Sequence, residues 1–110
     1  MEDLIEIIKI FSDETRIRIF NLLYEKECCI CDIENILNLK QPNISKHIKK
    51  MLLLKLIKKR KEGNWSYYSI NFEKINEYKF INEIILKLRE KNFLNGDIES
   101  LKKQKNICKG

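Results

Sequence analysis

Residues 35–61 read NILNLKQPNISKHIKKMLLLKLIKKRK and contain nine Lys or Arg side chains but no Asp or Glu. The formal net charge of the 110-residue chain is only +6. Of its 22 Lys and Arg residues, 13 therefore lie outside this block, against 16 Asp and Glu. A block of one charge sign with helical periodicity indicates a polyanionic partner. The alternative is a Lys-rich face that only contacts solvent.

The same block predicts a helix followed by a hairpin. Proline is tolerated in the first turn of a helix, so the KQP sequence at residues 40–42 predicts a helix that begins near Gln41. We expect it to end near Lys55, with an apolar stripe formed by Ile44, Ile48, Met51 and Leu52. Residues 57–61 and 65–70 are β-prone around a Glu-Gly-Asn turn, which predicts two antiparallel strands.

Apolar periodicity predicts further helices on both sides of the block. Residues 2–11 form the first, and a second helix follows Asp13, whose carboxylate suits an N-cap. A short helix is expected over residues 32–39. Residues 72–92 predict a long helix whose apolar face is wide enough to need more than one covering neighbour. A Lys-rich tail occupies residues 95–110.

Composition and length restrict the class of protein. A chain of 110 residues with 44% hydrophobic residues, one Pro and three Gly is typical of one mainly helical domain. We place that domain at residues 1–94. No apolar run approaches the roughly 20 residues needed to span a bilayer, and the N-terminus lacks a signal-peptide pattern. We therefore expect a cytoplasmic protein without a membrane partner.

Two short helices followed by a basic hairpin are the outline of a winged helix-turn-helix, in which the second helix enters the major groove of DNA. Amides can read adenine edges, whereas Lys mostly contacts phosphate or guanine. An alternative role for His47 is to brace its own helix. The candidate DNA contacts are polar or basic and lie on the second helix or the hairpin: Gln41, Asn43, Ser45, Lys46, His47, Lys49, Lys50, Arg60, Lys61 and Asn64.

Four segments, in this order, resemble the ArsR/SmtB family of metal-responsive repressors: FSDETRIRIFNLL (11–23), ECCICDIENIL (27–37), QPNISKHIKKM (41–51) and EGNWSYYSI (62–70). The resemblance covers roughly residues 4–92. It implies a dimeric, mainly helical winged helix-turn-helix that is not an enzyme. It also implies a homodimer formed through residues 2–11 and 72–92, and double-stranded operator DNA as the partner. Lys40 departs from the family pattern, because relatives usually carry a Ser that caps the recognition helix.

The resemblance places Cys29 and Cys31 on the family's C-x-C motif, at the start of the third helix. Residues i and i+2 of an extended segment point to the same side, so both sulfurs can face one ion while Cys28 points away. We expect Cys28 to be a buried small hydrophobe. Soft thiolates select As(III), Cd(II), Pb(II) or Zn(II). No organic cofactor is expected.

Cys31 is the expected N-cap of this helix, with Glu34 in the capping-box position, and the helix dipole there favours a thiolate. Some arsenic-sensing relatives supply a third Cys where this chain has Glu34. Cys108 is then the candidate third ligand, with a tail thiol of no role as the alternative. The family's zinc site between dimer-interface helices is not expected, because residues 72–92 contain no His.

These observations predict a repressor that a thiophilic ion releases from its operator. One alternative keeps the repressor but switches it by thiol oxidation or persulfide formation, with a bridge between Cys29 and Cys108. A thiol oxidoreductase is disfavoured because the chain has no C-x-x-C motif. An adaptor that has lost DNA binding is disfavoured by the concentrated basic block.

Overall fold

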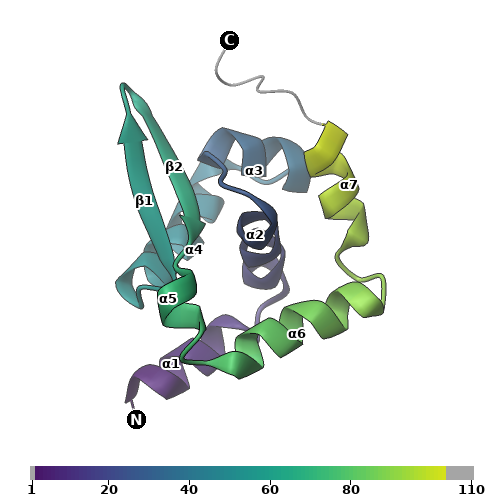
Figure 1. The fold of residues 1–110 in the computed structure, drawn as a ribbon. Helices are drawn as coiled ribbons and strands as arrows, with labels where there is room; N and C mark the ends of the chain where they lie inside the picture. Colours follow the sequence, from purple (N-terminus) through teal and green to yellow (C-terminus); the bar gives the residue numbers. More distant parts are fainter. Residues whose placement is uncertain (1, 104–110) are drawn as a thin grey trace.

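A computed structural model describes residues 2–103 of the chain. Within that range the chain is mainly helical with one two-stranded hairpin, as predicted (Figure 1). Four helices precede the hairpin and three follow it: α1 (Glu2–Ile10), α2 (Glu14–Glu25), α3 (Ile30–Leu37), α4 (Gln41–Leu53), β1 (Ile57–Glu62), β2 (Trp65–Ile70), α5 (Phe72–Ile75), α6 (Lys79–Glu90) and α7 (Asn95–Lys103).

Helix α2 lies at the centre of the molecule and supplies much of its core (Figure 1). Its Ile19, Phe20 and Leu22 side chains have no exposed surface. The helix begins after Asp13, whose carboxylate accepts a hydrogen bond of 3.0 Å from the Arg16 N–H. This confirms the predicted N-cap, which satisfies one of the unpaired N–H groups of the first turn.

The hairpin extends away from the helices as a wing (Figure 1). Its strands pair antiparallel from Ile57–Ile70 at the base to Glu62–Trp65 at the tip, and Gly63 in the turn has φ +61°. The two strands differ in burial: β1 exposes every residue after Ile57, whereas β2 buries both of its tyrosines. β1 therefore supplies the solvent-facing charges of the wing and β2 attaches it to the domain.

The prediction of one helix over residues 72–92 is wrong. The chain forms α5 and α6, separated by residues 76–78, and the Tyr78 N–H donates to the Ile75 carbonyl at 2.9 Å. On one continuous helix, Ile75 and Ile81 would point about 120° apart. Both side chains have no exposed surface, so the break allows both to enter the core.

Residues 95–103 of the predicted tail form α7, which packs against α2 and α3. Leu101 is buried, and the Arg18 guanidinium donates two hydrogen bonds of 2.9 Å to the Asp97 carboxylate. This segment is therefore attached to the domain.

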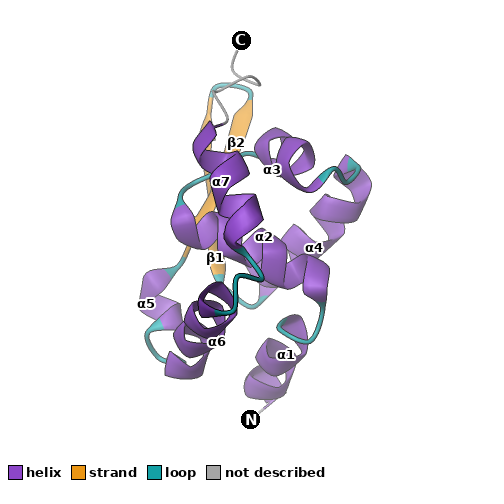
Figure 2. Ribbon diagram, turned by 90° about the vertical axis from the view of Figure 1, so that its right-hand side faces the viewer, coloured by secondary structure: helices purple, strands orange, loops and turns teal. Residues whose placement is uncertain are grey.

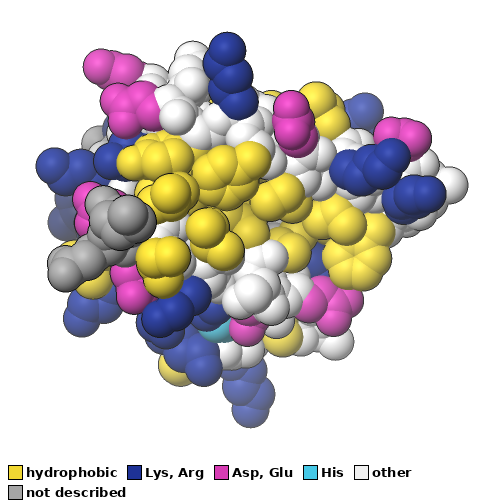
Figure 3. Space-filling view, turned by 90° about the horizontal axis from the view of Figure 1, so that it is seen from below, with side chains coloured by type: hydrophobic (Ala, Val, Ile, Leu, Met, Phe, Trp, Pro, Cys, Tyr) yellow, Lys and Arg dark blue, Asp and Glu magenta, His cyan; other side chains and the backbone are white. Residues whose placement is uncertain are grey.

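Helices α1 and α6 lie at the end of the molecule opposite α3 (Figure 2). The surface seen from that end carries a continuous band of apolar side chains (Figure 3). The exposed large apolar side chains of these two helices are Ile5 and Ile8 of α1 and Leu86 of α6, each about half exposed. No helix within residues 2–103 is long and apolar enough to cross a membrane.

Candidate nucleic-acid interface and thiol site

Helix α4 buries one face and leaves the other to solvent. Ile44, Ile48 and Met51 are buried, which confirms the predicted apolar stripe. The helix begins at Gln41 as predicted and ends at Leu53, two residues before the expected end. Of the predicted DNA contacts on α4, Gln41, Lys46, Lys49 and Lys50 are exposed, and Asn43 and Ser45 are half-buried.

His47, predicted as a DNA contact, does not belong to that exposed set. Its side chain is only 6% exposed, which favours the alternative bracing role over a contact with a base edge. Burial lowers the pKa of His47, although the nearby Asp13 carboxylate opposes that change. Its Nδ1 has no hydrogen-bond partner among the described residues. The bracing role considered for His47 is the one that the structure supports.

Three predicted contacts lie on the wing. Lys61 and Asn64 are exposed near its tip. Arg60 is half exposed, but its guanidinium is held by two carboxylates, at 2.7 Å from Glu27 and 3.0 Å from Glu62. It also lies over the Tyr67 ring, 4.7 Å from the centroid. In this structure the Arg60 guanidinium is therefore paired with carboxylates and is not free to bind a phosphate.

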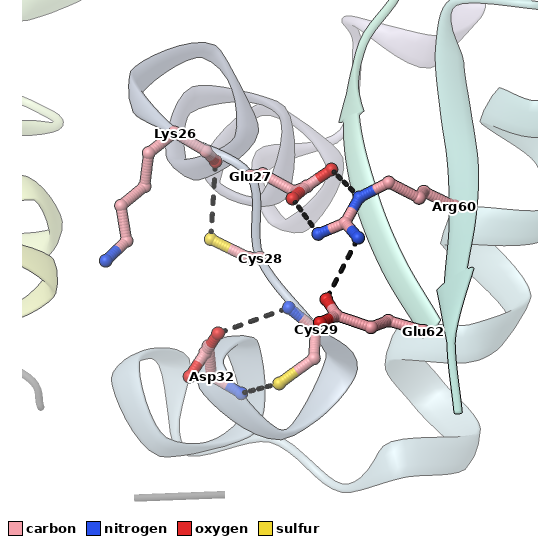
Figure 4. Close-up of polar contacts among 7 residues, drawn as sticks. All are labelled: Lys26, Glu27, Cys28, Cys29, Asp32, Arg60 and Glu62. Carbon is pink, nitrogen blue, oxygen red and sulfur yellow. Dashed lines mark hydrogen bonds and ion pairs between the residues drawn. The ribbon is translucent and has the colours of Figure 1, made fainter. Parts of the chain in front are cut away.

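The start of α3 is capped by Cys29, two residues before the predicted N-cap Cys31. The Asp32 N–H donates to Cys29 Sγ at 3.4 Å, and the Cys29 N–H donates to the Asp32 carboxylate at 3.2 Å (Figure 4). This reciprocal pair is a capping box in which sulfur replaces the usual hydroxyl oxygen. Cys31 is half-buried in the first turn, so the predicted capping pair of Cys31 and Glu34 is wrong.

Cys28 precedes the cap and is part of a short β-bridge. Its N–H donates to the Tyr68 carbonyl at 3.0 Å, and its carbonyl accepts from the Tyr68 N–H at 2.8 Å. The side chain has no exposed surface, and burial raises the pKa of its thiol to about 12. The prediction of a buried small hydrophobe at Cys28 is confirmed.

A pocket of about 370 Å³ joins the three elements of the predicted site. The N-cap Cys29 and the α3 residues Cys31 and Glu34 line it together with the first residue of α4, Gln41. The wing contributes Asn64 from its turn, and Trp65 and Tyr68 from β2. We call this the thiol pocket. Both residues of the C-x-C motif thus lie beside two predicted DNA contacts.

The described residues contain only part of a metal site. Burial raises the pKa of the Cys29 thiol, so an ion bound there must displace a proton. No group of three His, Cys, Asp or Glu within residues 2–103 is arranged to hold a metal ion. The predicted third ligand, Cys108, lies outside the described residues. Cys29 Sγ fits a soft ion chemically, because sulfur is the preferred donor for thiophilic metals. Cys31 is disulfide-bonded in this structure, so it can bind an ion only after that bond is reduced.

Sequence reasoning missed two residues of this region. Asp32 lies three residues after Cys29, which is the capping-box spacing, so a local signal was present. Glu27 pairs with Arg60 across 33 residues of sequence, and no local pattern indicates such a contact.

The buried core around α2, the α3–α4 pair and the basic wing define a winged helix-turn-helix DNA-binding regulator. A family described as "Bacterial regulatory protein, arsR family" matches residues 13–59. An uncharacterised helix-turn-helix transcriptional regulator of Methanocaldococcus jannaschii is 38% identical over 81 residues, which are 72% of this chain and 91% of that protein. The chain belongs to the arsR family, whose members are DNA-binding transcriptional regulators and not enzymes.

Two characterised proteins are also similar. An arsenical resistance operon repressor of Staphylococcus aureus is 37% identical over 70 residues, covering 64% of this chain and 67% of the repressor. The crystal structure of the transcriptional repressor PagR of Bacillus anthracis is 34% identical, with a TM-score of 0.63, and the match covers 79% of this chain and 93% of PagR. These similarities agree with the winged helix-turn-helix fold.

Proposed function

We propose that this chain is a transcriptional repressor that leaves its operator when a thiophilic ion binds Cys29 and Cys31. The observation that carries the proposal is the thiol pocket, which both cysteines share with Gln41 of the recognition helix and Asn64 of the wing. An ion in this pocket would lie directly beside both DNA-binding elements. The name of the S. aureus relative, an arsenical resistance operon repressor, supports As(III) as one inducer. Cd(II) and Pb(II) have the same preference for sulfur.

The cap of α3 gives ion binding a structural consequence. Cys29 Sγ is both the proposed ligand atom and the acceptor for the Asp32 N–H. A bound ion competes for that sulfur and weakens the cap. Because α3 packs against α4, a loosened α3 changes the support of the recognition helix. Linkage then requires that bound DNA weaken ion binding by the same factor.

Cys108 is the proposed third sulfur, since As(III) takes three bonds and two are supplied by the C-x-C motif. Glu34 also lines the thiol pocket, but it offers a carboxylate in place of a soft ligand. A Cys108→Ser variant should bind As(III) more weakly and keep its affinity for DNA.

The test is a titration of the protein bound to a DNA duplex that it has selected from a random pool. Arsenite, Cd²⁺, Pb²⁺ and a peroxide oxidant are added separately, and release is followed by fluorescence anisotropy. Cys31→Ser should bind the duplex as the wild type does but no longer respond to the ions. A normal response of Cys31→Ser to every ion would reject the proposed site. Release by the oxidant alone would favour the alternative thiol redox switch.

On the DNA side, we propose that Gln41, Asn43 and Ser45 read base edges. Lys46, Lys49, Lys50 and Lys61 are proposed to contact phosphates, and Asn64 to contact the backbone or the minor groove. Exposure of the four Lys side chains supports this division. Phosphate contacts release counterions, so replacing one of these Lys residues by Met should reduce the salt slope of log K by about 0.9.

We further propose that two copies associate through the apolar band of α1 and α6. Exposed Ile5, Ile8 and Leu86 would then be covered in the dimer. Leu86→Glu should shift the protein to a monomer in sedimentation velocity, whereas Trp65→Glu, at the tip of the wing, should not.

A further inference from the structure

The loop between α2 and α3, residues 26–29, is attached to both strands of the wing. Its attachment to β2 is through backbone, because Cys28 and Tyr68 exchange two hydrogen bonds of 3.0 and 2.8 Å. Its attachment to β1 is through side chains. Arg60 donates from Nε to Glu27 at 3.2 Å and from Nη2 at 2.7 Å (Figure 4). We call residues 26–29 the sensor loop.

The orientation of Arg60 is determined by more than Glu27. Its third guanidinium nitrogen donates to Glu62 at 3.0 Å, and its plane lies over the Tyr67 ring. Successive residues of a strand point to opposite faces, so Arg60 projects from one face of the hairpin and its neighbours Lys59 and Lys61 project from the other. Lys59 and Lys61 are exposed, and Arg60 is the side chain that turns toward the sensor loop.

The sensor loop ends at the atom proposed to bind the ion. Cys29 Sγ accepts the cap hydrogen bond of α3, and Glu27 is only two residues earlier in the chain. Between them, Cys28 is held in the β-bridge with a fully buried side chain. A movement of Cys29 toward a bound ion therefore acts on a short, doubly attached segment, and that segment leads to the wing.

We propose that the Glu27–Arg60 pair is a positioning contact that transmits occupancy of the thiol pocket to the wing. Arg60 acts through Glu27 and does not bind phosphate, contrary to its assignment from the sequence. Ion binding displaces the sensor loop, and the pair carries β1 with it, so that the wing lysines leave the DNA backbone. This inference rests on the proposed function, because it presumes release by an ion bound at Cys29 and Cys31.

The experiment compares DNA affinity with and without Cd²⁺ in the full chain and in matched variants, all with the Cys31 disulfide reduced beforehand. Glu27→Gln removes the charge that crosses from the loop to β1. Glu62→Gln is its control, because Glu62 lies on the same strand as Arg60 and its bond to Arg60 stays within β1. Cd²⁺ binding is followed separately by thiolate–metal absorbance, and DNA binding by anisotropy on the selected duplex.

We expect Glu27→Gln to bind Cd²⁺ and free DNA as the wild type does. The ratio of its DNA affinities without and with Cd²⁺ should fall about two- to five-fold. Glu62→Gln should keep the wild-type ratio. A wild-type ratio in Glu27→Gln, or an equal loss in Glu62→Gln, would overturn the proposal. Absence of Cd²⁺ absorbance or of release in the wild type would reject the proposed function itself, and the positioning role with it.

A second readout separates positioning from direct contact. Arg60→Met should reduce the Cd²⁺ response but leave the salt slope of log K unchanged, because no phosphate contact is lost. Lys61→Met, on the opposite face of the same strand, should reduce that slope by about 0.9 and leave the Cd²⁺ response unchanged. A reduced slope in Arg60→Met would show that Arg60 contacts phosphate and would overturn its positioning role.

Discussion

The starts of α3 and α4 are alike in packing but different in capping. Each helix has a fully buried isoleucine four residues after its N-cap, Ile33 in α3 and Ile44 in α4. The start of α3 is closed by the reciprocal hydrogen bonds of Cys29 and Asp32. At α4, the N-cap Lys40 makes no side-chain hydrogen bond. Packing therefore positions both helices, but only α3 begins with a side-chain bond that a ligand can remove.

Packing should account for the largest effects at both helix starts. Ile33→Ala and Ile44→Ala should each lower the free energy of unfolding by about 2–5 kcal/mol, because each leaves a cavity in the core. Urea denaturation measures both, and Leu53→Ala on the exposed side of α4 is the control, expected within about 0.5 kcal/mol of wild type. A loss below about 1 kcal/mol at either isoleucine would contradict positioning by packing.

Capping should account for a smaller effect, confined to α3. Cys29→Ala removes the acceptor for the Asp32 N–H and should lower the free energy of unfolding by about 1 kcal/mol. Cys29→Ser keeps an acceptor oxygen and should be within about 0.5 kcal/mol of wild type, although neither variant should respond to Cd²⁺. Equal stability of the Ala and Ser variants in urea would mean that the sulfur cap does not stabilise α3.

The comparison also explains which parts of the site could be predicted. The start of α4 follows from Pro42, because proline restricts where a helix can begin. The start of α3 has no such marker, and two Cys–acid pairs with the same spacing compete for the cap. Cys29 is the N-cap in the structure, and the residue before it, Cys28, forms a β-bridge with Tyr68. This bridge is a tertiary contact between segments 40 residues apart, which helical periodicity cannot reveal.

Other differences from the sequence predictions have the same origin. The break between α5 and α6 contains no Pro or Gly, and it is explained only by the burial of Ile75 and Ile81. Arg60 looks like a wing cation in the sequence, and only the fold brings Glu27 to it. Periodicity thus predicted most of the elements and the family resemblance pointed to the thiol motif, whereas the contacts that couple them depend on the three-dimensional arrangement.

A side-chain cap can be added at α4 to make its start resemble that of α3. Lys40→Ser supplies a side-chain acceptor for the Asn43 N–H, which donates to the Lys40 carbonyl at 3.1 Å in the present structure, and should raise the free energy of unfolding by about 0.5 kcal/mol. Thermal unfolding measures the change. Lys49→Ser, within the same helix, is the control and should be slightly destabilising, since Ser is a weaker helix former than Lys. An equal effect of both substitutions would show that α4 gains nothing from a cap.

The smallest expected effect is a pH dependence that belongs to α4 alone. Burial lowers the pKa of His47 below its ordinary value of 6.5, with the charges of Arg16, Lys46 and Lys50 acting in the same direction and Asp13 against it. Below pH 6.5 the unfolded chain then binds a proton more readily than the folded one. The free energy of unfolding should therefore fall as the pH drops through that value.

Urea denaturation between about pH 5 and 7.5 measures this loss above the range where most carboxylates titrate. His47→Gln removes the titrating group and should flatten the profile over that range. Cys29→Ser, which changes α3 only, should keep the wild-type slope. If His47→Gln retained the wild-type slope, another group would be titrating over this pH range. The buried imidazole would then not account for a difference in pH response between α4 and α3.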